Sequence, residues 1–104
     1  MADSIKPISG EKTYRKVRVG AMSTTDLDKD LKEKHIDTLI LCGIVTGGVV
    51  LSTVRDASDK DYRIIVLKDA CLDADPQVHE VLVEKVFPRQ STVTTVAEFI
   101  SAQV

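Results

Sequence analysis

A short turn with three glycines, residues 43–48, is the part of this 104-residue chain best suited to chemistry. It follows an apolar run, 38–44, and leads into a run, 47–57, in which apolar residues recur at helical spacing. A strand, a tight turn and a helix in this order expose backbone N–H groups at the positive end of the helix, where they can bind an anion or an oxyanion. The glycines could equally serve only to turn and pack the chain. Since the run has neither GxGxxG nor a final Gly-Lys-Ser/Thr, nucleotide binding is not favoured.

Four side chains with a thiol or a hydroxyl are candidate nucleophiles: Cys42, Thr46 and Ser52 at or beside this turn, and Cys71 in the loop after the next expected strand. We expect Cys42 and Cys71, at the ends of apolar runs, to be buried reduced thiols, and Cys42 to point into packing. Thr46 and Ser52 have hydroxyls, but no histidine or carboxylate is obviously placed as their base.

The two histidines are isolated in the sequence. His79 follows Asp73 and Asp75, yet this loop lacks a recognised metal-ligand spacing. We therefore expect His79 to be a surface residue of a helix, and we expect neither a metal nor a cofactor.

The elements that position the turn alternate between strand and helix. Residues 38–44 and 62–67 read as strands buried on both faces, and residues 14–19 as a weaker strand. Crossover helices between successive strands predict a parallel sheet with helices on both faces, a three-layer α/β fold. The other expected elements are a helix capped by Thr24 or Thr25 that ends near His35, a helix that begins at Asp75-Pro76 with Val78, Val81, Leu82 and Val86 facing inward, a strand at 92–96, and a helix at 96–103 with a Thr95–Glu98 capping box.

Composition limits the possible partners. The net charge of −2 and the aromatic content of 4% argue against nucleic-acid binding. No apolar stretch approaches the roughly 18 residues of a membrane span, and no apolar leader is present, so we expect a cytoplasmic protein. Residues 1–12 are predicted to be a flexible arm, and residues 13–104 one domain.

Several motifs together resemble one family. The turn and the helix after it resemble the signature of the isochorismatase-like cysteine hydrolases, and the similarity extends over roughly Arg15 to Thr95. The matching segments are Lys16–Met22 with Thr25-Asp26-Leu27, Ile36–Leu39, Gly43–Thr46, Val50–Thr53, Arg55-Asp56-Ala57, Asp61–Arg63, Asp69–Cys71, His79-Glu80 and Phe87-Pro88-Arg89.

The resemblance implies a Rossmann-like fold that hydrolyses an amide or a vinyl ether with an Asp, a Lys and a Cys. Lys16 matches the lysine, but Val49 stands at the position of the nucleophilic cysteine. The aspartate belongs to a first strand that precedes the matched region, so we expect an N-terminally truncated version of the fold without the usual cysteine mechanism. The expected pocket or oxyanion turn consists of Ile44, Val45, Thr46, Gly47 and Gly48.

Two other functions stay open at this point. One is a non-catalytic binding or interaction module that keeps the pocket for a small-molecule ligand, and a weaker one is an anion-binding flavodoxin-like domain. In either case the strand at 39–44, which pairs with the first strand in the full family fold, would expose an apolar edge. We therefore expect a homo-oligomer, most simply a dimer.

Overall fold

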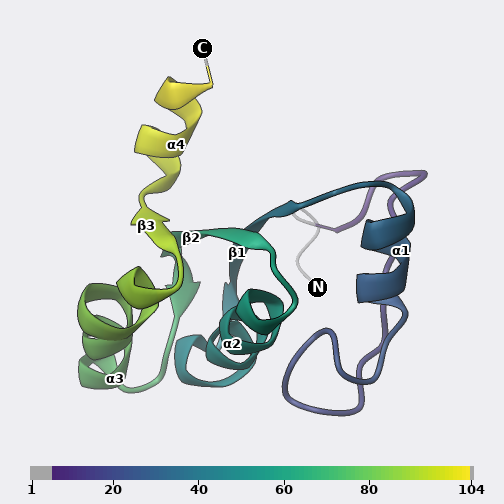
Figure 1. The fold of residues 1–104 in the computed structure, drawn as a ribbon. Helices are drawn as coiled ribbons and strands as arrows, with labels where there is room; N and C mark the ends of the chain where they lie inside the picture. The colour runs from purple at the N-terminus through teal and green to yellow at the C-terminus, as the bar shows by residue number, and fades with distance from the viewer. Residues whose placement is uncertain (1–5, 104) are drawn as a thin grey trace.

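The structure, a computed structural model, describes residues 6–103. Its helices and strands alternate along the chain (Figure 1). They are α1 (Leu27–Glu33), β1 (Thr38–Ile44), the π-helical turn η2 (Thr46–Val50) that runs into α2 (Leu51–Asp59), β2 (Arg63–Leu72), α3 (Pro76–Val81) with the turns η3 (Leu82–Val86) and η4 (Phe87–Arg89), β3 (Thr92–Thr94) and α4 (Val96–Ala102).

The three strands form one parallel sheet in the order β1-β2-β3. Thr38 of β1 pairs with Arg63 of β2, and the register shifts between Leu41 and Gly43, so that Gly43 pairs with Cys71. Gly43 has a φ of 138°, a conformation that favours glycine. The predicted parallel α/β sheet is confirmed.

The predicted strand at residues 14–19 is wrong. This segment has no regular secondary structure, and the backbone N–H of Val17 donates to the hydroxyl of Thr24 instead of to a neighbouring strand. Val17 and Val19 are exposed, so the weak alternation in the sequence does not reflect a buried face.

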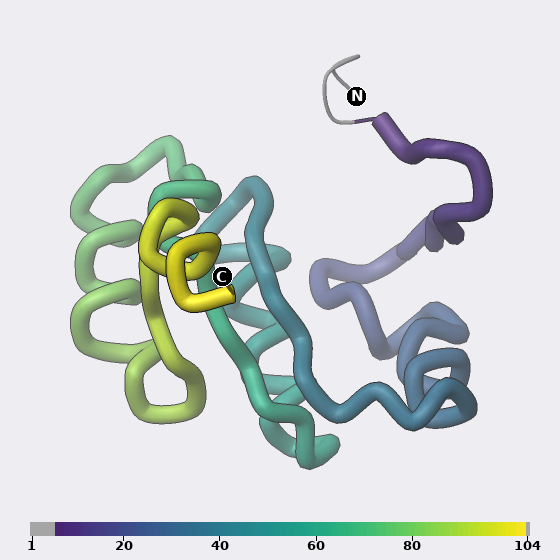
Figure 2. Tube along the Cα trace, turned by 90° about the horizontal axis from the view of Figure 1, so that it is seen from above, coloured from purple at the N-terminus to yellow at the C-terminus, as the bar shows by residue number. Residues whose placement is uncertain are grey.

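Helices lie on both sides of the sheet. Helices α2 and α3 cover one face, and α4 projects from the other (Figures 1 and 2). The core lies between the sheet and the helices α2 and α3, where Val54, Val66 and Phe87 are fully buried. Residues 6–103 contain no helix of the length and apolarity that a membrane span requires.

Strand β1 is buried on one face only, which corrects the expectation that both of its faces are covered. Leu39 and Leu41 pack against the core, whereas the exposed fractions of Ile40 and Ile44 are 48% and 67%. The side chains of a strand alternate between faces, so the exposed set lies on the face opposite α2.

The helix ends follow the sequence signals in most places. Asp75 caps α3 by accepting from the N–H of Gln77, with Pro76 as the first helical residue, and Thr95 caps α4 by accepting from the N–H of Glu98. The cap of α1 is Asp26 rather than a threonine, although Thr25 Oγ1 accepts a hydrogen bond from the N–H of Leu27.

The inward stripe predicted for the third helix is partly wrong. Leu82 is buried, but the exposed fractions of Val78 and Val81 are 39% and 48%. Val83 and Phe87 take the inner positions because the wider π-helical turn at 82–86 changes which residues face the sheet.

Candidate functional site

The turn singled out in the sequence joins β1 to the helix formed by η2 and α2. The chain leaves β1 at Ile44, passes through a cis peptide to Val45, and enters the helix at Thr46. This places the turn at the carboxyl end of a parallel strand, where open α/β sheets bind their ligands. The five predicted turn residues, Ile44 to Gly48, are therefore brought together at this end of the sheet.

A hydrogen bond to α3 holds Thr46, the first residue of η2. Thr46 is fully buried, and its Oγ1 lies 2.7 Å from Nδ1 of His79. His79 lies on a helix, as expected, but it is half-buried and not isolated, and the expectation that no histidine lies beside the Thr46 hydroxyl is wrong. Because Thr46 exposes no surface, this pair fixes the turn and offers no nucleophile to a ligand.

A second contact clamps the next residue. The N–H of Gly47 donates to Oδ2 of Asp73 at 2.8 Å, while Oδ1 of Asp73 accepts from the N–H of Asp75 at 3.0 Å. The backbone N–H groups of Asp75 and Gly47 stabilise the charged carboxylate and lower the pKa of Asp73 below its usual value. We call the pair of contacts, Thr46–His79 and Gly47–Asp73, the turn clamp.

The clamp explains why a glycine occupies position 47. A Cβ at Gly47 would lie 3.0 Å from Oδ2 of Asp73 and 3.0 Å from Cγ1 of Val78. At Gly48 a Cβ would meet only Val45 and Val19, at ordinary contact distances of 3.7 and 3.9 Å. Close packing of Asp73 and α3 on the turn therefore favours glycine at position 47 but not at position 48.

Val49 follows the turn and has an apolar environment. Its side chain is half-buried and packs against the core. It lines a hollow of about 110 Å³ together with Ala21, Leu41, Cys42, Val50 and Thr53. Val49 therefore contributes apolar surface to this hollow and has no reactive atom.

The segment that carries Lys16 lies beside the turn and α2. The N–H of Ala21 donates to Oγ1 of Thr53 at 3.2 Å, and Gly20 approaches Ser52 closely. Lys16 is exposed, and its Nζ donates to the carbonyl oxygen of Arg18 at 3.1 Å. No carboxylate of residues 6–103 lies within ion-pair distance of this ammonium group.

The two cysteines differ in exposure, and neither forms a disulfide within residues 6–103. Cys71 is buried, which raises the pKa of its thiol, as expected for an inert packed cysteine. Cys42 is exposed, so its predicted burial is wrong. The cause is the uncovered face of β1.

The described residues, 6–103, include no cluster of three or more histidine, cysteine, aspartate or glutamate side chains that could hold a metal. The three residues of the acidic loop and α3 face separate partners: Asp73 faces Gly47, Asp75 faces Gln77, and His79 faces Thr46.

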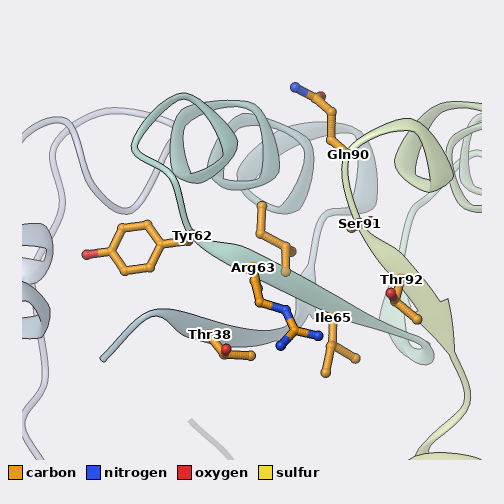
Figure 3. A pocket seen from close by; sticks show the side chains of 8 residues that line it. Thr38, Tyr62, Arg63, Ile65, Gln90, Ser91 and Thr92 are labelled. Carbon is orange, nitrogen blue, oxygen red and sulfur yellow. The ribbon is translucent and has the colours of Figure 1, made fainter. Parts of the chain in front are cut away.

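A larger hollow than the one beside Val49 lies away from these residues. It has a volume of about 510 Å³ and opens at the amino ends of the strands, where Thr38, Arg63 and Thr92 begin β1, β2 and β3 (Figure 3). Figure 3 shows Thr38, Arg63 and Ile65 on the side of the sheet away from α2. Because α/β sheets bind ligands at the carboxyl ends of their strands, we place the candidate site at the turn and not here.

Sequence reasoning missed the turn clamp, although one signal pointed to it. Asp73, Asp75 and His79 follow the carboxyl end of β2, which lies beside the carboxyl end of β1 in a parallel sheet. Residues that follow neighbouring parallel strands meet at one edge of the sheet.

Comparisons with known proteins agree with the fold and with the sequence motifs. The model of the isochorismatase domain matches residues 1–98. An uncharacterized isochorismatase family protein of Bacillus subtilis is 38% identical over 91 residues, which are 88% of this chain and 48% of that protein. The ureidoacrylate amidohydrolase of Methylobacterium radiotolerans is 33% identical over 103 residues, which are 98% of this chain and 40% of that protein.

Solved structures lead to the same assignment. An isochorismatase-like hydrolase from Alkaliphilus metalliredigens matches with a TM-score of 0.93 and 32% identity, over 99% of this chain and 56% of that one. The chain thus spans about half the length of the relatives that it matches. The motifs, the parallel fold and these matches together show that the chain belongs to the isochorismatase family.

Proposed function

We propose that this chain keeps the pocket scaffold of an isochorismatase-family hydrolase without the thiol mechanism. The observation that carries the proposal is Val49, an apolar side chain packed against the core at the position that the family resemblance assigns to the nucleophile. A thiolate attacks carbon and holds the acyl group until water releases it, and a valine can do neither.

The remaining parts of the site support a scaffold role. The turn clamp holds the turn in one conformation, and Lys16 supplies a positive charge on the adjacent segment. The substrate class that the scaffold suggests is a small amide or vinyl ether. The amide is favoured because one relative is an amidohydrolase that acts on ureidoacrylate.

The second candidate function is a module that binds a small molecule without turning it over. The hollow of about 110 Å³ beside Val49 favours it, since this hollow is lined mainly by apolar side chains and can take a small apolar group. Ligand binding without turnover distinguishes this function from a hydrolase that uses another nucleophile.

Turnover assays test the proposal. The purified chain is incubated with ureidoacrylate and with a vinyl ether, with and without iodoacetamide, and the ureidoacrylate amidohydrolase of M. radiotolerans is the positive control. We expect no turnover that iodoacetamide abolishes. Thiol-dependent turnover that is lost in Cys42→Ser or in Cys71→Ser would overturn the proposal, because it would show that another cysteine replaces the missing one.

A further inference from the structure

The hydroxyl of Thr46 depends on one histidine for its hydrogen bond. Thr46 is fully buried, and the partner that the structure gives its Oγ1 within residues 6–103 is Nδ1 of His79, at 2.7 Å. No buried side-chain nitrogen or oxygen atom of these residues lacks a partner. A buried hydroxyl has a hydrogen to donate, and a buried donor without an acceptor destabilises the fold. We therefore assign the O–H of Thr46 as the donor and Nδ1 as the acceptor, with the hydrogen of the neutral imidazole on Nε2.

Protonation of the His79 ring would remove this acceptor. An imidazolium carries a hydrogen on both nitrogens, so Nδ1 could then donate to Oγ1 of Thr46 but could not accept from it. The O–H of Thr46 would be left without an acceptor, in a side chain that exposes no surface to water. His79 itself is only half-buried, so its ring can exchange protons with the solvent. Histidine side chains gain or lose charge between about pH 5 and pH 8, which makes this hydrogen bond sensitive to protons.

Few charged groups surround this hydrogen bond. The turn η2, which packs against α3, carries no titratable side chain. Asp73, in the loop before α3, interacts electrostatically with His79, and the N–H groups of Asp75 and Gly47 hold the pKa of Asp73 below its usual value, so its carboxylate stays charged in this pH range. An imidazolium at His79 would be attracted by this carboxylate while it loses the hydroxyl of Thr46. The remaining charged side chains of α3 and of η3 are exposed; they are Glu80, Glu84 and Lys85, with Asp75 at the N-cap of α3.

We propose that His79 is a positioning residue that couples the conformation of the turn to pH: the neutral imidazole holds Thr46 in place, and the imidazolium releases it. The amides of Gly48 and Val50 report on the turn, because their N–H groups both donate to the carbonyl oxygen of Val45, at 3.0 and 3.3 Å. Since the turn is the candidate site, a ligand would bind the neutral form more tightly. This consequence for a ligand rests on the proposed function, whereas the response of the turn to protons does not.

The first test is the nitrogen NMR spectrum of the His79 ring at about pH 7.5, recorded without ligand. The chain has one other histidine, the exposed His35, and the variant His35→Gln removes its signals. We expect the tautomer with hydrogen on Nε2 and an unprotonated Nδ1. The opposite tautomer would overturn the proposal, because Nδ1 would then be a donor already in the neutral ring and protonation would remove no acceptor.

The second test is amide hydrogen exchange at Gly48 and Val50, measured at about pH 7.5 and at about pH 5.5. The rates are corrected for the intrinsic pH dependence of exchange and referred to the amides of β2 that pair with β3. We expect the protection of the two turn amides to fall by about tenfold at the lower pH in the wild type and in the control His35→Gln.

Two variants assign this fall to the hydrogen bond between Thr46 and His79. His79→Gln has an amide oxygen that accepts a hydrogen bond but does not titrate, and Thr46→Val has no hydroxyl, so the fall should be absent from both. Thr46→Val keeps the test valid if His79→Gln fails to fold. Unchanged protection in the wild type, or the same fall in either variant, would overturn the proposal, because His79 would then not be the group that senses the pH. Neither measurement involves a ligand or turnover, so failure here is distinguishable from failure of the proposed function.

Discussion

Alanine substitutions at Gly47 and at Gly48 should change the free energy of unfolding in opposite directions. In a helical position alanine is favoured over glycine by about 0.5–1 kcal/mol. At Gly48 the added Cβ makes only ordinary contacts, 3.7 and 3.9 Å away. We therefore expect Gly48→Ala to stabilise the chain by about 0.5–1 kcal/mol.

At Gly47 the same methyl group meets two atoms at 3.0 Å, Oδ2 of Asp73 and Cγ1 of Val78. The half-exposed valine can rotate, but the carboxylate is held by the N–H of Gly47 itself at 2.8 Å. Overpacking of this kind costs roughly 1–3 kcal/mol. After the helical gain is subtracted, Gly47→Ala should destabilise by about 1 kcal/mol, so the two variants should differ by about 2 kcal/mol.

Urea denaturation, monitored by circular dichroism, measures the free energy of unfolding of both variants and of the wild type. The comparison is valid if the dependence of this free energy on urea concentration has the same slope in all three. The double variant Gly47→Ala with Asp73→Ala identifies the cause. If the carboxylate is the obstacle, removing it should cost less in the Gly47→Ala background than in the wild type. Equal stabilities of Gly47→Ala and Gly48→Ala would refute this account of the clamp.

Three further outcomes follow from the structure. Val49→Cys alone should not produce turnover of ureidoacrylate, because no carboxylate of residues 6–103 lies within ion-pair distance of Lys16 to act as the base; robust turnover by this variant would reveal such a base. Burial and the carboxylate of Asp28 raise the pKa of Tyr62 to about 12, so the free energy of unfolding should fall between about pH 10 and pH 12. Tyr62→Phe should make this fall shallower, at a cost of about 1 kcal/mol at neutral pH, and the remaining fall comes from Tyr14, Lys12 and Lys60, whose pKa values are also raised. An unchanged alkaline profile in Tyr62→Phe denaturation curves would contradict this assignment. Peptide mapping after brief iodoacetamide treatment of the native chain should find Cys42 alkylated well before Cys71, whose pKa is raised by burial; the reverse order would contradict the difference in exposure between the two thiols.

Local signals predicted the framework well because they act over a few residues. Thr95, the N-cap of α4, and its hydrogen-bond partner Glu98 are three residues apart in the sequence. At the start of α3, Asp75 is the N-cap and Pro76 is the first helical residue, which are the positions that these residue types favour. The position of the turn followed from a strand and a helix that are adjacent in the sequence. The family motifs also assign Val49 to the position of the nucleophile, and this assignment stays a prediction.

Contacts between distant segments could not be predicted in the same way. Thr46 and His79 are 33 residues apart, and only the pairing of β1 with β2 brings the segments that follow these strands together. The apolar content of β1 suggested burial on both faces, but burial depends on what covers the sheet, which residue types do not specify. The exposure of Ile40 and Cys42 is therefore a finding of the structure alone.

The proposed absence of the family's nucleophile from the turn is tested most directly by the mass of the intact protein after mixing with an amide substrate. A thiol mechanism leaves the acyl group on sulfur until water releases it. After rapid mixing with ureidoacrylate and an acid quench, we expect the mass of this chain to be unchanged. A mass increase equal to the acyl group, mapped to Cys42 or Cys71, would contradict it.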